Sequence, residues 1–192
     1  LSGFARLFKT TGDPQIGERA LYLMREWAKT IDDDGFYGYG DKGSVNQYIF
    51  DKYVCGLVDI YEYMDCPEAL ELLSRITKYM EDICVDGDKT YLNHEWYTVA
   101  ENLYRAYLLS GEQRYFDFAK RFNFTEYWNA FAQKKDPFGI LPPPEKHEGF
   151  HAYSHVNTFS SAAMAYAATG EQHFLETVVN AYDWLKATQL YA

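Results

Sequence analysis

The sequence has too few basic residues to balance its acidic ones. The 18 Lys and Arg face 28 Asp and Glu, which gives a net charge of −10. Binding to a nucleic-acid backbone requires clustered Lys and Arg, so we expect no nucleic-acid partner. No stretch approaches the roughly 20 uninterrupted apolar residues that cross a bilayer, so we expect no membrane partner either. No alternation of apolar and polar residues is long enough to indicate a strand.

Cysteine is also scarce. Cys55, Cys66 and Cys84 cannot all pair with one another, and none lies in a CxxC or similar metal-binding spacing. We therefore expect reduced, mostly buried thiols and no metal site or cofactor in this segment. Unpaired thiols favour a reducing compartment such as the cytoplasm. Residues 1–9 lack the pattern of a signal peptide, and the chain begins without Met and stops abruptly, so we expect a piece of a longer protein whose export is not fixed.

Aromatic residues, in contrast, are abundant. The chain has 18 Tyr, 13 Phe and 4 Trp, which is 18% of its residues. Some of these must form the core by helix–helix packing. Tyrosines also line wet, concave surfaces, where the ring packs and the hydroxyl bonds a polar ligand such as a sugar. Both interpretations remain open for any single tyrosine.

Four segments repeat one arrangement, a helix followed by a short turn and a second amphipathic helix. Gly12, Gly111 and Gly170 can take the left-handed conformation that ends a helix. Asp13 can cap the next helix, with Pro14 at its first position. The pattern predicts the helix pairs 2–10 with 14–29, 45–63 with 67–83, 97–110 with 113–132, and 156–169 with 172–188.

Longer connections rich in Gly, Asp, Pro and aromatic residues join these pairs, at Asp32–Ser44, Val85–Glu95 and Lys134–Ser154. Long connections at one end of paired helices are typical of a closed toroid with binding loops at one mouth. The sequence therefore predicts an all-α fold in one domain over residues 1–192, made of antiparallel helix hairpins of an (α/α)6 toroid that is incomplete at about four hairpins. A helical solenoid is the structural alternative. The acidic, aromatic stretch Asp32–Gly43 is either a ligand-facing loop or an ordinary one.

The segment Asn93–Asn102 is the first candidate for chemistry. Glu95 lies in the loop, and Glu101 lies near the start of a helix, where a carboxylate is stabilised as the anion. Glycoside hydrolysis requires two carboxylates, one as acid and one as base or nucleophile. Trp96 and Tyr97 between them supply aromatic faces for a sugar. The alternative is helix capping and ordinary surface charge.

The segment His147–Thr158 is the second candidate. His151 and His155 are four residues apart and would form a metal pair on one helical face. However, Gly149 and the preceding prolines place His151 in a loop, and Ser154 is well placed to cap a helix starting near His155. The sequence therefore favours a histidine and Asn157 that bond a polyol over a metal pair.

The stretches Glu95–Gly111 and His151–Gly170 resemble the β-L-arabinofuranosidase family, glycoside hydrolase family 127 and its relatives. Asp51–Tyr63 is similar to the family's helix that usually opens with His-Lys. The resemblance covers most of the chain, and His155-Val-Asn-Thr158 is its most specific part. Trp96 stands where the family motif His-Gly-Gly-Met-Asn-Glu has its histidine, and Asp51 stands where the helix-opening histidine is expected. This pattern indicates a divergent branch.

The resemblance implies an (α/α)6 barrel that acts on arabinofuranosides. It gives His155 a role in the sugar site, matches Glu101 to the glutamate of the family motif, and places Asp51 at a substrate-binding position. It also implies a cysteine nucleophile beside a zinc held by further cysteines and a glutamate, all later in the family's chain. Cys55, Cys66 and Cys84 do not match those positions, so we expect zinc only in a longer parent protein and no hydrolysis by this segment alone.

The resulting hypothesis is a glycoside hydrolase with catalytic Glu101 and Glu95. Its substrate-binding residues are Asp51, Trp96, Tyr97, His151, His155 and Asn157. Two alternatives remain: another toroid enzyme acting on sugars, such as an unsaturated-glycuronyl hydrolase or an epimerase, and a helical-repeat binding module without catalysis. An incomplete toroid exposes apolar hairpin faces, so we also expect pairing with another chain, including a second copy of itself.

Overall fold

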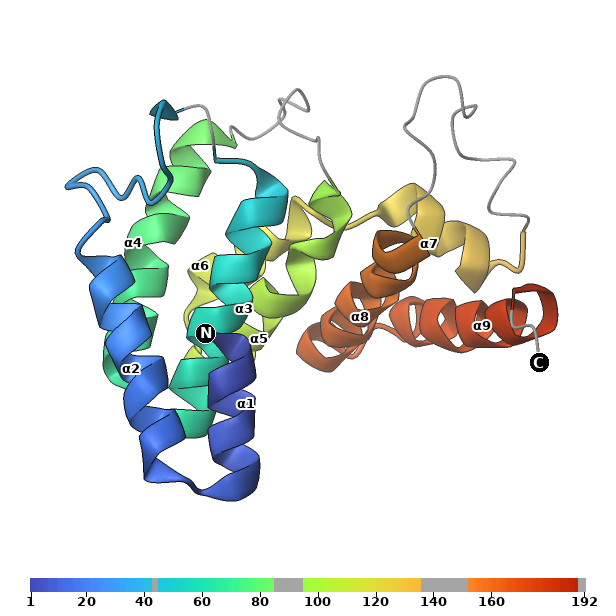
Figure 1. Ribbon diagram of the computed structural model, residues 1–192. Helices are drawn as coiled ribbons and strands as arrows, with labels where there is room; N and C mark the ends of the chain where they lie inside the picture. Colours follow the sequence, from blue (N-terminus) through green and yellow to red (C-terminus); the bar gives the residue numbers. More distant parts are fainter. Residues whose placement is uncertain (43–44, 85–94, 136–151, 190–192) are drawn as a thin grey trace. The chain divides into compact units, whose positions relative to one another are not determined.

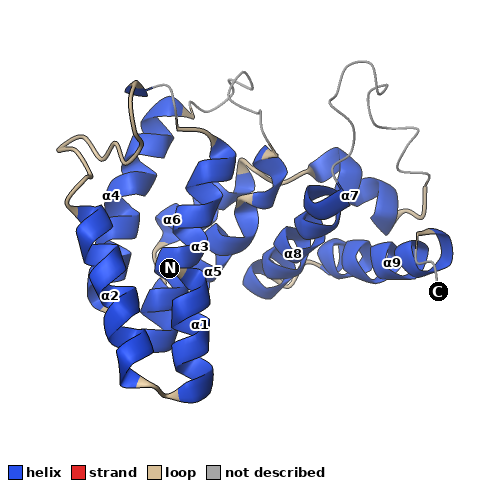
Figure 2. Ribbon diagram, in the orientation of Figure 1, coloured by secondary structure: helices blue, strands red, loops and turns tan. Residues whose placement is uncertain are grey.

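The computed structural model describes residues 1–42, 45–84, 95–135 and 152–189. Within these ranges the secondary structure is entirely helical, without a strand (Figure 2), which confirms the all-α fold class. None of the helices found there has the length and apolar character that a membrane span requires. The chain divides into two compact units, Leu1–Trp96 and Tyr97–Ala192. The expectation of one domain over the whole chain stays a prediction.

Within its described residues, the first unit contains two helix hairpins (Figure 1). Helix α3 packs against α1, α2 and α4, and α1 also packs against α2. The core that these contacts form includes the fully buried side chains of Met24, Phe50, Leu57 and Leu73. Both predicted pairs are present, with bounds α1 (Ser2–Thr11), α2 (Pro14–Ala28), α3 (Gln47–Met64) and α4 (Pro67–Ile83).

The long connection between α2 and α3 is anchored to this core by aromatic residues. Phe36 and Tyr37 are buried, and the ring of Tyr37 meets Trp27 and Tyr53 edge-on. The Tyr79 hydroxyl donates to the Lys42 carbonyl oxygen at 2.8 Å. These contacts fix the loop as part of the first unit's packing.

The described part of the second unit contains five helices, and the 3-10 turn η2 precedes them. Helix α5 packs against α6 and α8, and α9 packs against α7 and α8. Its core is strongly aromatic and includes the fully buried Tyr115, Phe118, Phe122, Tyr127 and Trp128. The bounds are η2 (Trp96–Thr98), α5 (Ala100–Ser110), α6 (Gln113–Lys120), α7 (Thr125–Ala132), α8 (Ala152–Thr169) and α9 (Gln172–Thr188).

Two predictions about this unit are wrong in detail. The helix predicted over 113–132 is broken between Lys120 and Thr125, where the Tyr104 hydroxyl donates to the Asn123 side chain at 3.1 Å. Helix α8 begins at Ala152, so Ser154 lies inside its first turn and does not cap a helix starting near His155. The start of α8 is therefore one turn earlier than the sequence suggests.

Three hairpin turns share one hydrogen-bond pattern, which explains why the repeat is visible in the sequence. Gly12, Gly111 and Gly170 are left-handed, with φ of 66°, 74° and 72°. In each turn the preceding Thr or Ser hydroxyl donates to a carbonyl four residues back and accepts the N–H of the acidic residue after the glycine. At the remaining turn Asp65 takes the left-handed position, with φ of 50°.

The predicted cap of α2 is confirmed. An Asp13 side-chain oxygen accepts the Gln15 N–H at 2.9 Å, and Pro14 occupies the first helical position, where no donor is needed. Apolar residues recur at intervals of three and four along α4 and α9. Of these, Leu73, Ile76 and Met80 are buried, whereas Leu70 and Val178 are half-buried.

Candidate functional site

The start of α5 is joined to the middle of α8 by a buried serine. The backbone N–H of Glu101 donates to the Ser161 hydroxyl at 3.1 Å, and that hydroxyl reaches the Thr98 carbonyl oxygen at 3.5 Å. Ser161 and Thr98 are fully buried. Glu101 has one of the helix-start N–H groups that lack a partner within α5, and Ser161 supplies it. The two sequence motifs singled out above, around Glu101 and around His155, are therefore packed together within the second unit.

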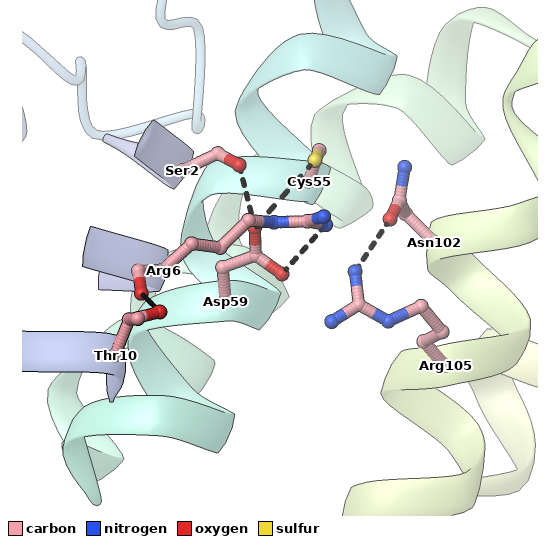
Figure 3. Close-up of polar contacts among 7 residues, drawn as sticks. All are labelled: Ser2, Arg6, Thr10, Cys55, Asp59, Asn102 and Arg105. Carbon is pink, nitrogen blue, oxygen red and sulfur yellow. Dashed lines mark hydrogen bonds and ion pairs between the residues drawn. The ribbon is translucent and has the colours of Figure 1, made fainter. Parts of the chain in front are cut away.

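The position of Glu101 suits an ionised carboxylate. The residue lies in the first turn of α5, and its side chain is half-exposed. The positive end of a helix dipole favours negative charge there. Asn102 follows it, is buried, and accepts a hydrogen bond from Arg105 Nη1 at 3.0 Å (Figure 3). Arg105 thus holds in place the side-chain amide of Asn102, the residue that follows Glu101.

His155 is buried against Tyr127. Its side chain is 4% exposed, and the Tyr127 hydroxyl lies within hydrogen-bonding distance of both ring nitrogens, at 3.0 Å from Nε2. Burial lowers the pKa of His155 below its ordinary value, so the neutral imidazole is favoured. In that form one ring nitrogen donates and the other accepts. Tyr127 can therefore hold the ring in place.

The same face of α8 is tied to α7 by a second polar contact. Trp128 Nε1 donates to the Thr158 hydroxyl at 2.9 Å, and Thr158 is fully buried. Since Thr158 lies three residues after His155, both side chains lie on one side of the helix. The first and last residues of the motif His155–Thr158 thus dock α8 onto α7.

Asn157 lies on a different face of α8 from His155. Two residues along a helix correspond to a rotation of about 200°, so Asn157 and His155 lie on nearly opposite sides of α8. Asn157 is half-exposed and lies one turn before Ser161, on the face that meets the start of α5. The sequence predicts a histidine and Asn157 that bond a polyol, and helix geometry places His155 and Asn157 on different faces of α8. The sugar-binding roles of both residues stay predictions.

A series of aromatic rings runs from η2 into α7 and α8. Tyr97 stacks on Phe124, with ring centroids 5.1 Å apart, and Phe124 stacks on Tyr127 at 5.0 Å. Tyr127 in turn stacks on Phe159 at 5.7 Å. Tyr97, which is half-exposed, is therefore the outer end of a series whose inner end contacts His155.

The remaining predicted residues belong to the first unit or lie outside the described residues. Glu95 has a left-handed backbone, with φ of 59°, and Trp96 opens η2; both are half-exposed. Because Glu95 and Glu101 fall in different units, their pairing as two catalytic carboxylates stays a prediction. His151 lies outside the described residues.

Asp51 belongs to a buried polar stripe on α3. Gln47, Asp51, Cys55 and Asp59 follow one another at intervals of four residues, and three of them are at most 2% exposed. Asp51 forms an ion pair with Lys52 Nζ at 2.9 Å, and Lys52 also lies over the Tyr48 ring. A carboxylate at this depth needs such partners, because burial penalises an unpaired charge.

An ion pair of the first unit between Arg6 and Asp59 was not anticipated. Arg6 of α1 binds the fully buried Asp59 through two bonds, Nε to Oδ2 at 2.7 Å and Nη2 to Oδ1 at 3.3 Å (Figure 3). The Ser2 hydroxyl donates to the same Oδ2 at 2.5 Å. The available sequence signal was the four-residue spacing of polar residues inside an otherwise apolar helix.

The three cysteines, all within the described ranges, form no disulfide, and their reduced state stays a prediction. Cys66 and Cys84 are buried, and Cys55 is half-buried. Burial, aided by the nearby Asp59 carboxylate, raises the pKa of Cys55 above its ordinary value. Cys55 is therefore held as a thiol, which is a poor nucleophile and a poor metal ligand.

Residues 1–192 match the model of the β-L-arabinofuranosidase GH127 catalytic domain. The chain belongs to this family. Membership places it among the glycoside hydrolases of the arabinofuranosidase type, whose substrate is a carbohydrate. No curated protein matches the chain.

The zinc centre that the family resemblance implies does not fit the described residues. Among residues 1–42, 45–84, 95–135 and 152–189, no group of three or more His, Cys, Asp or Glu side chains is arranged to hold a metal ion. The Cys84 sulfur instead accepts a long contact from the Gln47 amide, at 3.6 Å. No catalytic step is therefore assigned to zinc here.

Proposed function

We propose that the full-length protein that contains this GH127 domain hydrolyses β-L-arabinofuranosides, and that Glu101 and Asn157 contact the sugar. The observation that carries the proposal is the hydrogen bond from the Glu101 N–H to Ser161, which packs the start of α5 against the face of α8 that bears Asn157. The Glu101 carboxylate and the Asn157 amide, on these two packed helices, offer acceptors and donors for the hydroxyls of a furanose ring.

Glu101 is the proposed carboxylate that supports the reaction. Its place in the first turn of α5 favours the ionised form, which stabilises positive charge that develops on the sugar ring in an oxocarbenium-like transition state. Glu95 is the proposed second carboxylate, on the loop before η2. Trp96 and Tyr97, both half-exposed, are proposed to supply the aromatic surface for the sugar.

His155 is proposed as a positioning residue. Its ring is buried and held by Tyr127, so we assign it to the orientation of α8 and of the aromatic series that ends at Tyr97. Asp51, buried beside Lys52, keeps the substrate-binding role that its place in the family's helix implies.

The test is hydrolysis by the full-length protein of p-nitrophenyl β-L-arabinofuranoside, with the α-anomer and an unsaturated glucuronyl disaccharide as alternatives. We expect turnover of the β-anomer only. Asn157→Ala should lower kcat/KM about three- to tenfold, the value of one hydrogen bond, whereas Asn129→Ala, at a half-exposed asparagine of α7, should leave it unchanged. Turnover of the glucuronyl disaccharide alone would contradict the proposal.

A further inference from the structure

A hollow in the second unit lies between the end of α7 and α9. Its volume is about 510 Å³, and its lining comprises Phe131, Lys134, Lys135, Asn180, Asp183 and Trp184. This volume is within the range of about 300–1,000 Å³ that small-ligand sites occupy. None of these residues belongs to the sugar site proposed above.

The walls of the hollow are held in place by the fold. The Asn180 amide donates to the Phe131 and Ala132 carbonyl oxygens, at 2.9 and 3.2 Å, and so joins α9 to the C-terminal end of α7. The rings of Phe131 and Trp184 meet edge-to-face, with centroids 5.6 Å apart. The aromatic part of the lining is therefore fixed by contacts between the two helices.

Lys134 adopts a backbone conformation that lysine rarely takes. Its φ is 54°, and the helix closes with Lys134 N–H donating to the Phe131 carbonyl and Lys135 N–H to the Ala130 carbonyl. Glycine usually occupies this left-handed position after a helix. A lysine there accepts backbone strain and places a cation at the rim of the hollow, and such strain is typical of functional positions.

Three charged side chains belong to the lining of the hollow. Within the described ranges, the side chains of Lys134, Lys135 and Asp183 form no ion pair or hydrogen bond. Two cations, one carboxylate and an aromatic wall are thus gathered around one space. The lysines can bind a carboxylate, Asp183 can accept hydrogen bonds from hydroxyls, and Trp184 can pack on a sugar ring.

We propose that this hollow binds a carboxylated sugar residue of a glycan. The proposal rests on the proposed function only in taking the ligand to be a carbohydrate. A small inorganic anion fits less well, because the Asp183 carboxylate repels it and it cannot pack on the aromatic rings. A neutral sugar leaves both lysines unused.

The test is calorimetric binding of trigalacturonate and of its fully methyl-esterified form to the full-length protein. The two ligands differ in charge but share the sugar rings. We expect trigalacturonate to bind and the ester to bind at least about threefold more weakly. The pair Lys134→Ala and Lys135→Ala should weaken trigalacturonate binding about three- to tenfold, as expected for two exposed ion pairs.

The matched control is the pair Lys9→Ala and Lys78→Ala, which removes the same charge from exposed positions on α1 and α4 and should leave binding unchanged. Lys134→Gly supplies a variant that keeps the turn, with circular dichroism as the check on folding. Absence of binding, equal affinity for acid and ester, an equal loss in the control pair, or displacement by an equal concentration of inorganic phosphate would overturn the proposal.

Trigalacturonate binding at the hollow can be tested separately from arabinofuranoside hydrolysis at the proposed sugar site. Glu101→Gln should bind trigalacturonate as the unaltered protein does, because Glu101 is not part of the hollow. Binding without arabinofuranoside hydrolysis would leave this inference standing while the proposed function falls, and hydrolysis without binding would do the reverse.

Discussion

The Glu101 N–H and the Ser161 hydroxyl, 3.1 Å apart, connect the two sequence motifs from which a sugar site is proposed. The bond joins the first turn of α5 to a fully buried position of α8. It satisfies one of the helix-start donors that the hydrogen bonds within α5 do not use. The position of Glu101 thus depends on a residue sixty positions later in the chain.

Replacing this serine should loosen the connection. Ser161→Ala should lower the free energy of unfolding by about 1–2 kcal/mol, because it removes the buried hydroxyl that accepts the Glu101 N–H. Ser160→Ala removes the same hydroxyl at a neighbouring, half-exposed position and should change stability by less than about 0.5 kcal/mol. Urea denaturation measures both. Equal changes in the free energy of unfolding of the two variants would show that the bond between Ser161 and Glu101 does not stabilise the fold.

Replacing Arg6 and replacing Asp59 should lower the free energy of unfolding by different amounts. Arg6→Ala takes the bidentate partner from a fully buried carboxylate and should cost about 3 kcal/mol. Asp59→Asn removes the buried charge while it keeps the shape, so we expect a smaller loss. The double variant should be more stable than Arg6→Ala alone. A double-mutant cycle by chemical denaturation gives all three values, and strictly additive losses would contradict the account.

His155 should make stability depend on pH. Burial lowers its folded-state pKa, so the unfolded chain binds the proton more tightly. The contribution is therefore fully present above the ordinary pKa of about 6.5 and is lost as the pH falls toward the folded-state value. Between about pH 7.5 and about pH 5.5, unaltered protein should lose more unfolding free energy than His155→Gln. An equal loss of unfolding free energy in the unaltered protein and in His155→Gln would show that the pH dependence comes from a group other than His155.

Two glycines with equal free space should respond to alanine in opposite ways. A Cβ at Gly111 or at Gly3 meets nothing within 4 Å, but only Gly111 has a positive φ, of 74°. Gly111→Ala should destabilise by about 1 kcal/mol through backbone strain. Gly3→Ala, inside α1, should stabilise by about 0.5 kcal/mol. Thermal unfolding of the two variants tests the signs, and a stabilising Gly111→Ala would refute the role of the turn.

The sequence revealed the hairpins because their turns are local. A hydroxyl, a glycine and an acidic residue in succession determine where Gly12, Gly111 and Gly170 end one helix and allow the next to begin. The break between α6 and α7 contains neither Gly nor Pro. It depends instead on Tyr104, which reaches Asn123 from another helix, and no local pattern reports such a contact.

The site was predictable only in part for a similar reason. The resemblance picked out Glu101 and the motif His155–Thr158, which do lie in one unit. It could not distinguish the buried His155 from the half-exposed Asn157, because that depends on where α8 begins and on Tyr127 of α7. The Arg6–Asp59 pair was missed because its members are 53 residues apart.

The most direct test of the central claim is the kinetic effect of Glu101→Gln on hydrolysis of p-nitrophenyl β-L-arabinofuranoside by the full-length protein. The account predicts a loss of kcat/KM of about 100-fold or more, since the substitution removes the negative charge from a carboxylate that acts in the transition state. Glu112→Gln, at the exposed first position before α6, should retain full activity. Wild-type kinetics in Glu101→Gln would contradict the account.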